Sequence, residues 1–104
     1  MAMVKAQFLL PTHDNDGRAL AAEIAAVMDR IYDRFHGWTL EATVRGVFRM
    51  ADGSKKVDVC ERYMVLFDAT RIEELEQELR LFKAQTQQEA IYLEIQQDVD
   101  VRFI

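Results

Sequence analysis

The spacing of apolar residues along this chain switches between every second position and every third or fourth position. Residues 4–10 alternate, with apolar side chains at Val4, Ala6, Phe8 and Leu10, and this period of two predicts a half-buried β-strand. From about residue 17 to residue 36 the period becomes helical, and interspersed alanines raise helix propensity. The apolar stripe of this helix comprises Leu20, Ile24, Val27, Met28, Ile31, Tyr32 and Phe35.

Two further alternating segments, residues 38–50 and 55–67, flank the pair Asp52-Gly53. An Asp-Gly pair between two strand patterns is one of the stronger short signals for a β-hairpin. Before this hairpin, Gly37 stands where a left-handed C-cap would end the first helix.

A second helix is expected after the hairpin, beginning with a capping box formed by Thr70 and Glu73. Residues 90–95 then predict a last strand, and the tail at residues 98–104 keeps the alternation. We expect the tail to continue the last strand or to form a fifth one. The expected inward-facing residues of these segments are Ile72, Leu75, Leu79, Phe82, Ile91, Leu93 and Ile95.

The resulting order is β-α-β-β-α-β over one domain, residues 1–104. With right-handed crossovers, this order predicts an α+β ferredoxin-like sandwich, a four-stranded antiparallel sheet with both helices on one face. The first and third strands are then central.

Charge and composition exclude several classes of function. The chain carries 13 basic and 18 acidic residues, a net charge of −5, with no cluster of Lys and Arg, which argues against binding nucleic acid. No apolar run is long enough to cross a membrane, and the start of the chain lacks a secretory signal pattern. A lone cysteine, Cys60, fits a reducing compartment, so we expect a cytoplasmic protein.

The segment PTHDNDGR, residues 11–18, combines residue types found in metal and phosphate sites. Counted from Asp14, it places Ala19 where an EF-hand loop needs glycine, and it has neither zinc-ligand spacing nor a P-loop lysine. We interpret it as the start of a helix, with Pro11 ending the strand and Asp14, Asn15 or Asp16 as the N-cap. An anion at this helix end, assisted by Arg18, is the weaker alternative.

No residue pattern indicates catalysis, a cofactor or a metal site. Cys60 is expected to lie in the middle of the sheet as a small apolar residue, and the glutamates of the second helix are expected to form a solvated face. A polar cluster around Gln88 and Glu89 is interpreted as a helix-to-strand loop, or alternatively as the polar rim of a pocket between the helices and the sheet edge, joined by Tyr63, Arg45 and Glu61 if the strands splay. The candidate small-ligand residues are His13, Arg18, Tyr63 and Gln88.

The face of the sheet opposite the helices is expected to be more apolar than solvent exposure alone would favour. An apolar patch rimmed by charge indicates a partner surface, and a second copy of the same chain is the simplest partner. We therefore expect a homodimer joined sheet to sheet. Its predicted interface residues are Leu9, Val47, Cys60, Met64, Leu66 and Tyr92.

The motifs RFHGWT, GVFRMADG, ERYMVLF and TQQEAIYLEI, within residues 34–95, resemble those of small bacterial domains of unknown function. Those proteins often have tryptophan where this chain has Phe48. The resemblance implies the same fold and no activity. At the level of topology the chain also resembles the dimeric α+β barrel proteins, which include cofactor-free monooxygenases and isomerases. Two hypotheses follow: a homodimeric interaction or accessory module without catalytic activity, and a small cofactor-free enzyme or small-ligand binder.

Overall fold

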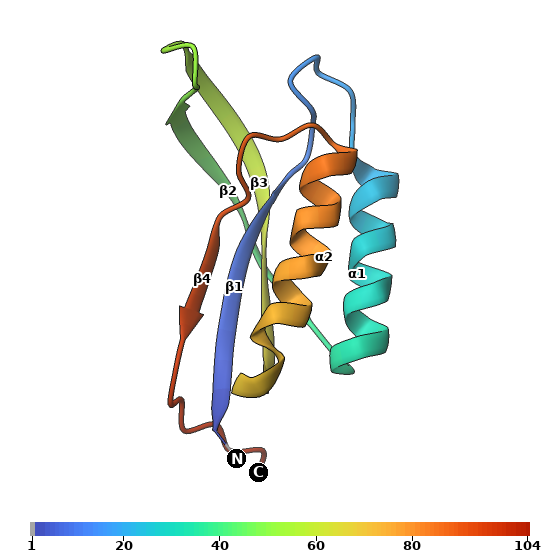
Figure 1. Ribbon diagram of the computed structural model, residues 1–104, viewed down its shortest axis with the longest axis vertical. Helices are drawn as coiled ribbons and strands as arrows, with labels where there is room; N and C mark the ends of the chain where they lie inside the picture. Colours follow the sequence, from blue (N-terminus) through green and yellow to red (C-terminus); the bar gives the residue numbers. More distant parts are fainter. Residues whose placement is uncertain (1) are drawn as a thin grey trace.

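The computed structural model describes residues 2–104 and has two layers, a sheet and a pair of helices (Figure 1). The elements follow one another as β1 (Met3–Pro11), α1 (Ala21–Phe35), β2 (Thr39–Arg49), β3 (Lys55–Asp68), a short 3-10 turn (Ala69–Arg71), α2 (Ile72–Gln85) and β4 (Leu93–Gln96). Both helices lie on one side of the sheet, and the β2–β3 hairpin projects beyond their ends (Figure 1). The predicted ferredoxin-like α+β fold is confirmed.

The four strands have the order β2-β3-β1-β4, and every neighbouring pair is antiparallel. Strands β1 and β3 are central, as predicted, and they pair without interruption from Met3 opposite Asp68 to Pro11 opposite Cys60. Because this register has no bulge, the odd-numbered residues of β3 share a face with the even-numbered residues of β1.

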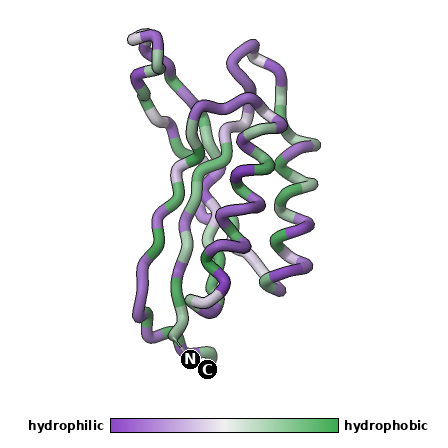
Figure 2. The backbone as a smooth tube through the Cα atoms, viewed as in Figure 1, coloured by the Kyte–Doolittle hydropathy of each residue, from purple (hydrophilic) through white to green (hydrophobic). Residues whose placement is uncertain are grey.

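The core lies between the helices and the face of the sheet formed by these residues. Phe8 is fully buried in the middle of β1, and its ring stacks on Tyr63 of β3 with 5.9 Å between centroids. The apolar stripes of both helices cover this face, and green apolar positions line the contact between the layers in Figure 2. The fully buried residues of large volume are Phe8, Phe82, Leu10, Leu20, Ile31, Leu75, Val4, Val27 and Val65.

Helix α1 begins at Ala21, later than the predicted residue 17, and none of the three predicted N-cap residues caps it. The Oδ1 atom of Asp14 instead accepts hydrogen bonds from the backbone N–H groups of Asp16 and Arg18, both at 2.9 Å. The carboxylate of Asp14 therefore binds backbone groups of its own loop and does not cap the helix. The loop closes through a bridge between His13 and Ala19, and the helix starts after it.

The hydrogen bonds to Asp14 in this loop should make the stability of the fold depend on pH. The backbone N–H of Arg18 holds the pKa of Asp14 below its ordinary value, and the N–H of Asp16 and the Arg18 side chain act in the same direction. A lowered pKa in the folded state stabilises the fold above the ordinary pKa, and this contribution is lost as the pH falls through the folded-state pKa. We expect Asp14→Asn to flatten the loss of stability between about pH 5 and about pH 2. Urea unfolding at successive pH values measures this, and an unchanged profile would contradict the assignment.

The other helix ends also differ from the predictions. At the end of α1 the left-handed residue is His36, with φ of 68°, rather than Gly37, and its N–H donates to the carbonyl of Tyr32. The Thr70–Glu73 capping box is absent among the described hydrogen bonds. Asp68 accepts from the N–H and hydroxyl groups of Thr70 at 2.9 and 2.7 Å, which forms the 3-10 turn before α2.

The C-terminal tail was predicted as strand, and this prediction is wrong. Strand β4 ends at Gln96, Asp98 adopts a left-handed conformation with φ of 55°, and residues 97–104 form no strand. The left-handed residue turns the chain away from the edge of β1, so its alternation has no neighbouring strand to pair with. Phe103, at the end of the chain, is 85% exposed.

The two helices are joined by an ion-pair cluster as well as by apolar packing. The carboxylate of Glu78 on α2 is buried, and it accepts from the Nε atom of Arg30 on α1 at 2.7 Å. The Nε atom of Arg34 lies 3.4 Å from the other oxygen of the same carboxylate. A buried charge paired in this way fixes how the helices sit on each other.

Candidate functional site

The face of the sheet opposite the helices, called here the open face, is covered by no helix or strand of residues 2–104 (Figure 1). The β1–β3 register places Leu9, Met64 and Leu66 there, because Leu9 pairs with Arg62, Gln7 with Met64 and Lys5 with Leu66. Tyr92 extends the row onto the β4 side, where its carbonyl accepts from the N–H of Leu9. These side chains are half-buried or exposed, so the open face carries apolar surface without a covering layer.

Val47 was predicted on the same face, and this placement is wrong. The register of β2 against β3 shifts between Leu40 and Ala42, where a β-bulge inserts one residue. After the bulge, Val47 pairs with Val57, so it lies on the side of the sheet that bears the helices. There the hairpin extends past the helices, and Val47 is 58% exposed.

Charged groups of both signs stand among the apolar residues of the open face. The Oε1 atom of Glu41 accepts from the Nε2 atom of Gln7 at 2.7 Å, and it lies 3.3 Å from the Nε atom of Arg62. That Nε atom is buried, yet it has no well-aligned acceptor among the described residues. This cluster therefore places both signs of charge on the open face within one copy of the chain.

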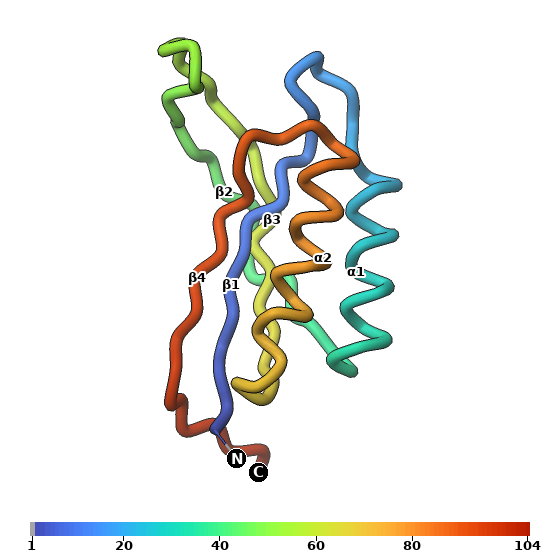
Figure 3. The backbone as a smooth tube through the Cα atoms, in the orientation of Figure 1, coloured from blue at the N-terminus to red at the C-terminus, as the bar shows by residue number. Residues whose placement is uncertain are grey.

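A cavity of about 260 Å³ lies at the hairpin end of the open face. Three segments distant in sequence form it: the end of β1, both arms of the hairpin, and the connection between α2 and β4. Figure 3 shows this connection passing across the sheet toward β4. The lining residues are Leu9, Pro11, Phe48, Arg49, Met50, Lys56, Asp58, Cys60, Gln88, Glu89, Ala90, Ile91 and Tyr92.

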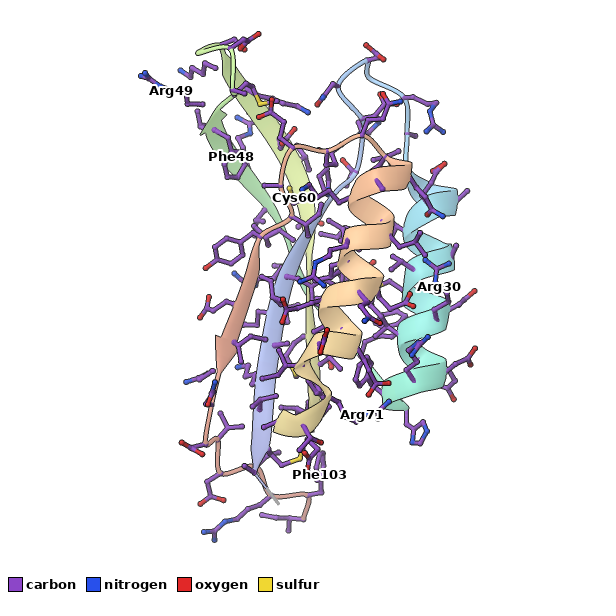
Figure 4. The ribbon with its side chains drawn as sticks, in the orientation of Figure 1. Arg30, Phe48, Arg49, Cys60, Arg71 and Phe103 are labelled. Carbon is purple, nitrogen blue, oxygen red and sulfur yellow. The ribbon has the colours of Figure 1, made fainter. Side chains whose placement is uncertain are left out.

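Cys60 lies in this cavity and is 3% exposed (Figure 4). Its position on the open face agrees with the alternation of β3, but the hairpin and the connection bury it. Burial raises the pKa of the Cys60 thiol, and the negative charge of Asp58 acts in the same direction. The thiol therefore stays protonated at neutral pH and is a poor nucleophile.

One wall of the cavity depends on a glycine in the middle of β2. Phe48 lines the cavity, and a Cβ atom at Gly46 would stand 2.5 Å from two atoms of the Phe48 ring. A contact that short is impossible, so the ring occupies space that only glycine leaves free. Gly46 thus lets Phe48 lie flat along its own strand.

The polar rim of the cavity is held together by contacts between segments. Lys56 pairs with Asp58 at 3.3 Å, and its Nζ atom also donates to the side-chain oxygen of Asn15 in the loop after β1. Across the cavity, both carboxylate oxygens of Glu89 accept from the N–H of Ala51 at the hairpin tip, at 3.1 and 3.3 Å. The rim therefore joins the hairpin to both neighbouring loops.

The four candidate ligand residues from the sequence do not come together. Gln88 lines the cavity, whereas His13 lies in the loop after β1, and Arg18 pairs there with Asp14 and Glu23. Tyr63 points into the core beneath the helices and donates to Glu61; burial raises its pKa, and the hydrogen bond to Glu61 adds to the shift.

Gln88 and Glu89 border the cavity on the open face, not the predicted pocket between the helices and the sheet edge, and Tyr63, Arg45 and Glu61 do not line it. Sequence reasoning missed Phe48 and the contact between Glu89 and Ala51. The only signal for Phe48 was a glycine at an interior strand position two residues before an aromatic residue.

The described part of the chain contains neither a metal-ligand cluster nor a membrane-spanning helix. No group of three or more His, Cys, Asp or Glu side chains is arranged to hold a metal ion in residues 2–104. Among the described helices, neither is long and apolar enough to span a bilayer.

Comparison with protein-family models and with curated proteins finds no match. Among solved structures, the chain is similar to CutA1 from Oryza sativa, with a TM-score of 0.71 and 9% sequence identity. The likeness covers 98% of this chain and 84% of that one. At this identity the likeness establishes the fold alone: this chain is a small α+β protein of the ferredoxin-like kind.

Proposed function

We propose that this protein is a cytoplasmic interaction or accessory module without catalytic activity, and that it works as a homodimer joined through the open face. The observation that carries the proposal is that no helix or strand of residues 2–104 covers Leu9, Met64, Leu66 and Tyr92. Antiparallel sheets that face only solvent are normally polar on that side. The protonated state of Cys60 and the burial of Tyr63 favour a role without nucleophilic chemistry.

The distribution of charge supports a second copy as the partner. A two-fold axis brings the same patch of both copies together, so the patch must be complementary to itself. The basic residues Lys5 and Arg62 and the acidic residues Glu41 and Glu94 supply both signs of charge within this face.

The size of the molecule is adequate for such an interface. A stable interface buries about 800 Å² from each partner, which is roughly an eighth of the 6755 Å² surface of this chain. One broad face of a four-stranded sheet is the natural source of that area in a two-layer protein.

A charge placed in the centre of the open face tests the proposal. We expect Met64→Asp and Leu66→Asp each to convert the dimer to a monomer of 12.1 kDa in sedimentation equilibrium, because an unpaired carboxylate would be buried at the interface. Circular dichroism should stay unchanged, since both side chains lie outside the core.

Val47→Asp is the matched control, because Val47 is an exposed apolar residue of the same sheet on the side that bears the helices. We expect this variant to remain dimeric. If Val47→Asp dissociates the dimer while Met64→Asp does not, the interface lies on the projecting hairpin and the proposal is wrong.

A further inference from the structure

We infer that the cavity between the β2–β3 hairpin and the α2–β4 connection binds a small uncharged molecule with an aromatic ring, which packs against Phe48 and hydrogen-bonds to Gln88. This inference goes beyond the proposed self-association and does not depend on it. Of the four open-face residues that carry the proposed self-association, only Leu9 and Tyr92 also line the cavity.

The volume and the inner surface of the cavity set the size and polarity of the ligand. At about 260 Å³, it is just below the usual range for sites of drug-sized ligands, roughly 300–1,000 Å³, so a single-ring molecule fits better than a nucleotide. The sheet side of the cavity is apolar and comprises Leu9, Pro11, Phe48, Cys60 and Ile91. An apolar lining of this kind selects for a ring or a hydrocarbon group.

Phe48 gives this lining its preference for an aromatic ring. Its ring lies against Gly46, in space that a Cβ atom at that position would take. It also remains 42% exposed, which leaves ring surface for a ligand to cover. Aromatic pairs are more favourable than their buried area alone accounts for.

The charges at the rim argue against an ionic ligand. Two basic residues, Arg49 and Lys56, are matched by two acidic residues, Asp58 and Glu89. Lys56 already pairs with Asp58 and Asn15, and Glu89 already accepts from the N–H of Ala51. Arg49 has no ion pair among the described residues, but the four charges of the rim cancel, so a charged ligand would lose its hydration without a net attraction to the rim.

Gln88 supplies the polar group that an uncharged ligand needs. Its side chain is buried at the cavity, and its one described hydrogen bond is a long one, 3.4 Å from Nε2 to the carbonyl of Thr86. The amide therefore keeps hydrogen-bonding capacity for a hydroxyl or N–H group of the ligand. The contact between Glu89 and Ala51 holds the walls on either side of this amide together.

Binding of benzyl alcohol to the isotope-labelled full chain, followed by amide chemical shifts, tests the inference. We expect saturable shifts at Leu9, Phe48, Cys60 and Ile91, and slower alkylation of Cys60 by iodoacetamide at saturation. Benzoate and benzylamine have the same ring with a charge of either sign, and each should bind at least about tenfold more weakly. Shifts that fail to saturate, or benzoate binding as tightly as the alcohol, would overturn the inference.

Variants of the wall separate binding at this cavity from binding elsewhere. Phe48→Leu keeps an apolar side chain but removes the ring, whereas Gly46→Ala keeps the ring but displaces it. Each variant should weaken the binding of benzyl alcohol by about tenfold. Phe103→Ala, which removes an exposed ring at the opposite end of the molecule (Figure 4), should bind as the parent does. Unchanged binding by Phe48→Leu would exclude this cavity as the site.

One further variant keeps the two proposals apart. Met64 is not among the residues that line the cavity, so Met64→Asp should bind benzyl alcohol with unchanged affinity even as a monomer. Loss of binding in this variant, with the fold intact, would contradict the independence of the cavity from the dimer.

Discussion

Truncation of Phe8 to alanine should remove about 3–5 kcal/mol from the free energy of unfolding, the usual effect of deleting a fully buried aromatic ring. Phe8 lies at the centre of β1, stacks on Tyr63, and faces the apolar stripes of both helices. The core cluster that contains Phe8 draws its buried side chains from β1, β3, α1 and α2, which limits how far it can close around the missing ring. A domain of this size has roughly 5–15 kcal/mol of total stability, so the variant should be close to unfolding.

Urea unfolding followed by the fluorescence of Trp38 measures this effect, because Trp38 contacts Tyr63 edge-on at 5.4 Å and reports on the same region. Phe103→Ala is the matched control. The same chemical change at a residue that is 85% exposed should alter stability by no more than about 0.5 kcal/mol. Equal losses in the two variants would mean that Phe8 does not occupy the core.

The second large effect is expected at the ion pair between the helices. Arg30→Met should destabilise the protein by about 2 kcal/mol, because the buried carboxylate of Glu78 loses its 2.7 Å charged hydrogen bond and keeps only the longer contact to Arg34. Methionine retains the apolar stem of arginine, so packing between the helices is preserved. The measured quantity is again the free energy of unfolding in urea.

Arg80→Met provides the control for this prediction. Arg80 forms a 3.0 Å ion pair with Glu76 on the surface of α2, and pairs of this kind contribute about 0.5 kcal/mol or less. A double-mutant cycle of Arg30→Met with Glu78→Gln should give a coupling of more than about 0.5 kcal/mol. If Arg30→Met and Arg80→Met have equal effects, the pair between the helices contributes no more than a surface pair.

The elements of the fold could be predicted from the sequence because each has a local cause. The alternation of β1, the apolar stripes of the helices and the Asp52-Gly53 turn each depend on residues close in sequence. Once the order of elements is known, the handedness of crossovers leaves few topologies, and both central strands follow.

The errors arise where one residue has two possible partners. Asp14 can cap a helix or close its own loop, and the loop competes successfully because Arg18 provides both a backbone and a side-chain donor. The tail alternates as strands do, but no neighbouring strand pairs with it beyond Gln96. Val47 changes sides because a bulge has no reliable sequence signature, and one extra residue inverts all the alternation that follows it.

The cavity was foreseen only through its rim. Gln88 and Glu89 stood out as polar residues beside a strand, whereas the wall formed by Phe48 depends on the fold that brings residues 46–60 against residues 88–92. The burial of Cys60 has the same origin, since the strand alternation alone places it on the exposed side. Contacts between segments so far apart in sequence can be predicted only if the register of the sheet is known, and no local sequence pattern specifies that register.

The central claim is that the open face of the sheet is buried by a second copy of the chain. Hydroxyl-radical footprinting over a series of protein concentrations tests this residue by residue. We predict that Met64 and Leu66 become protected as concentration rises, while Val47 and Val57 react equally throughout. Constant reactivity at Met64 and Leu66, or protection that appears at Val47 and Val57 instead, would contradict the claim.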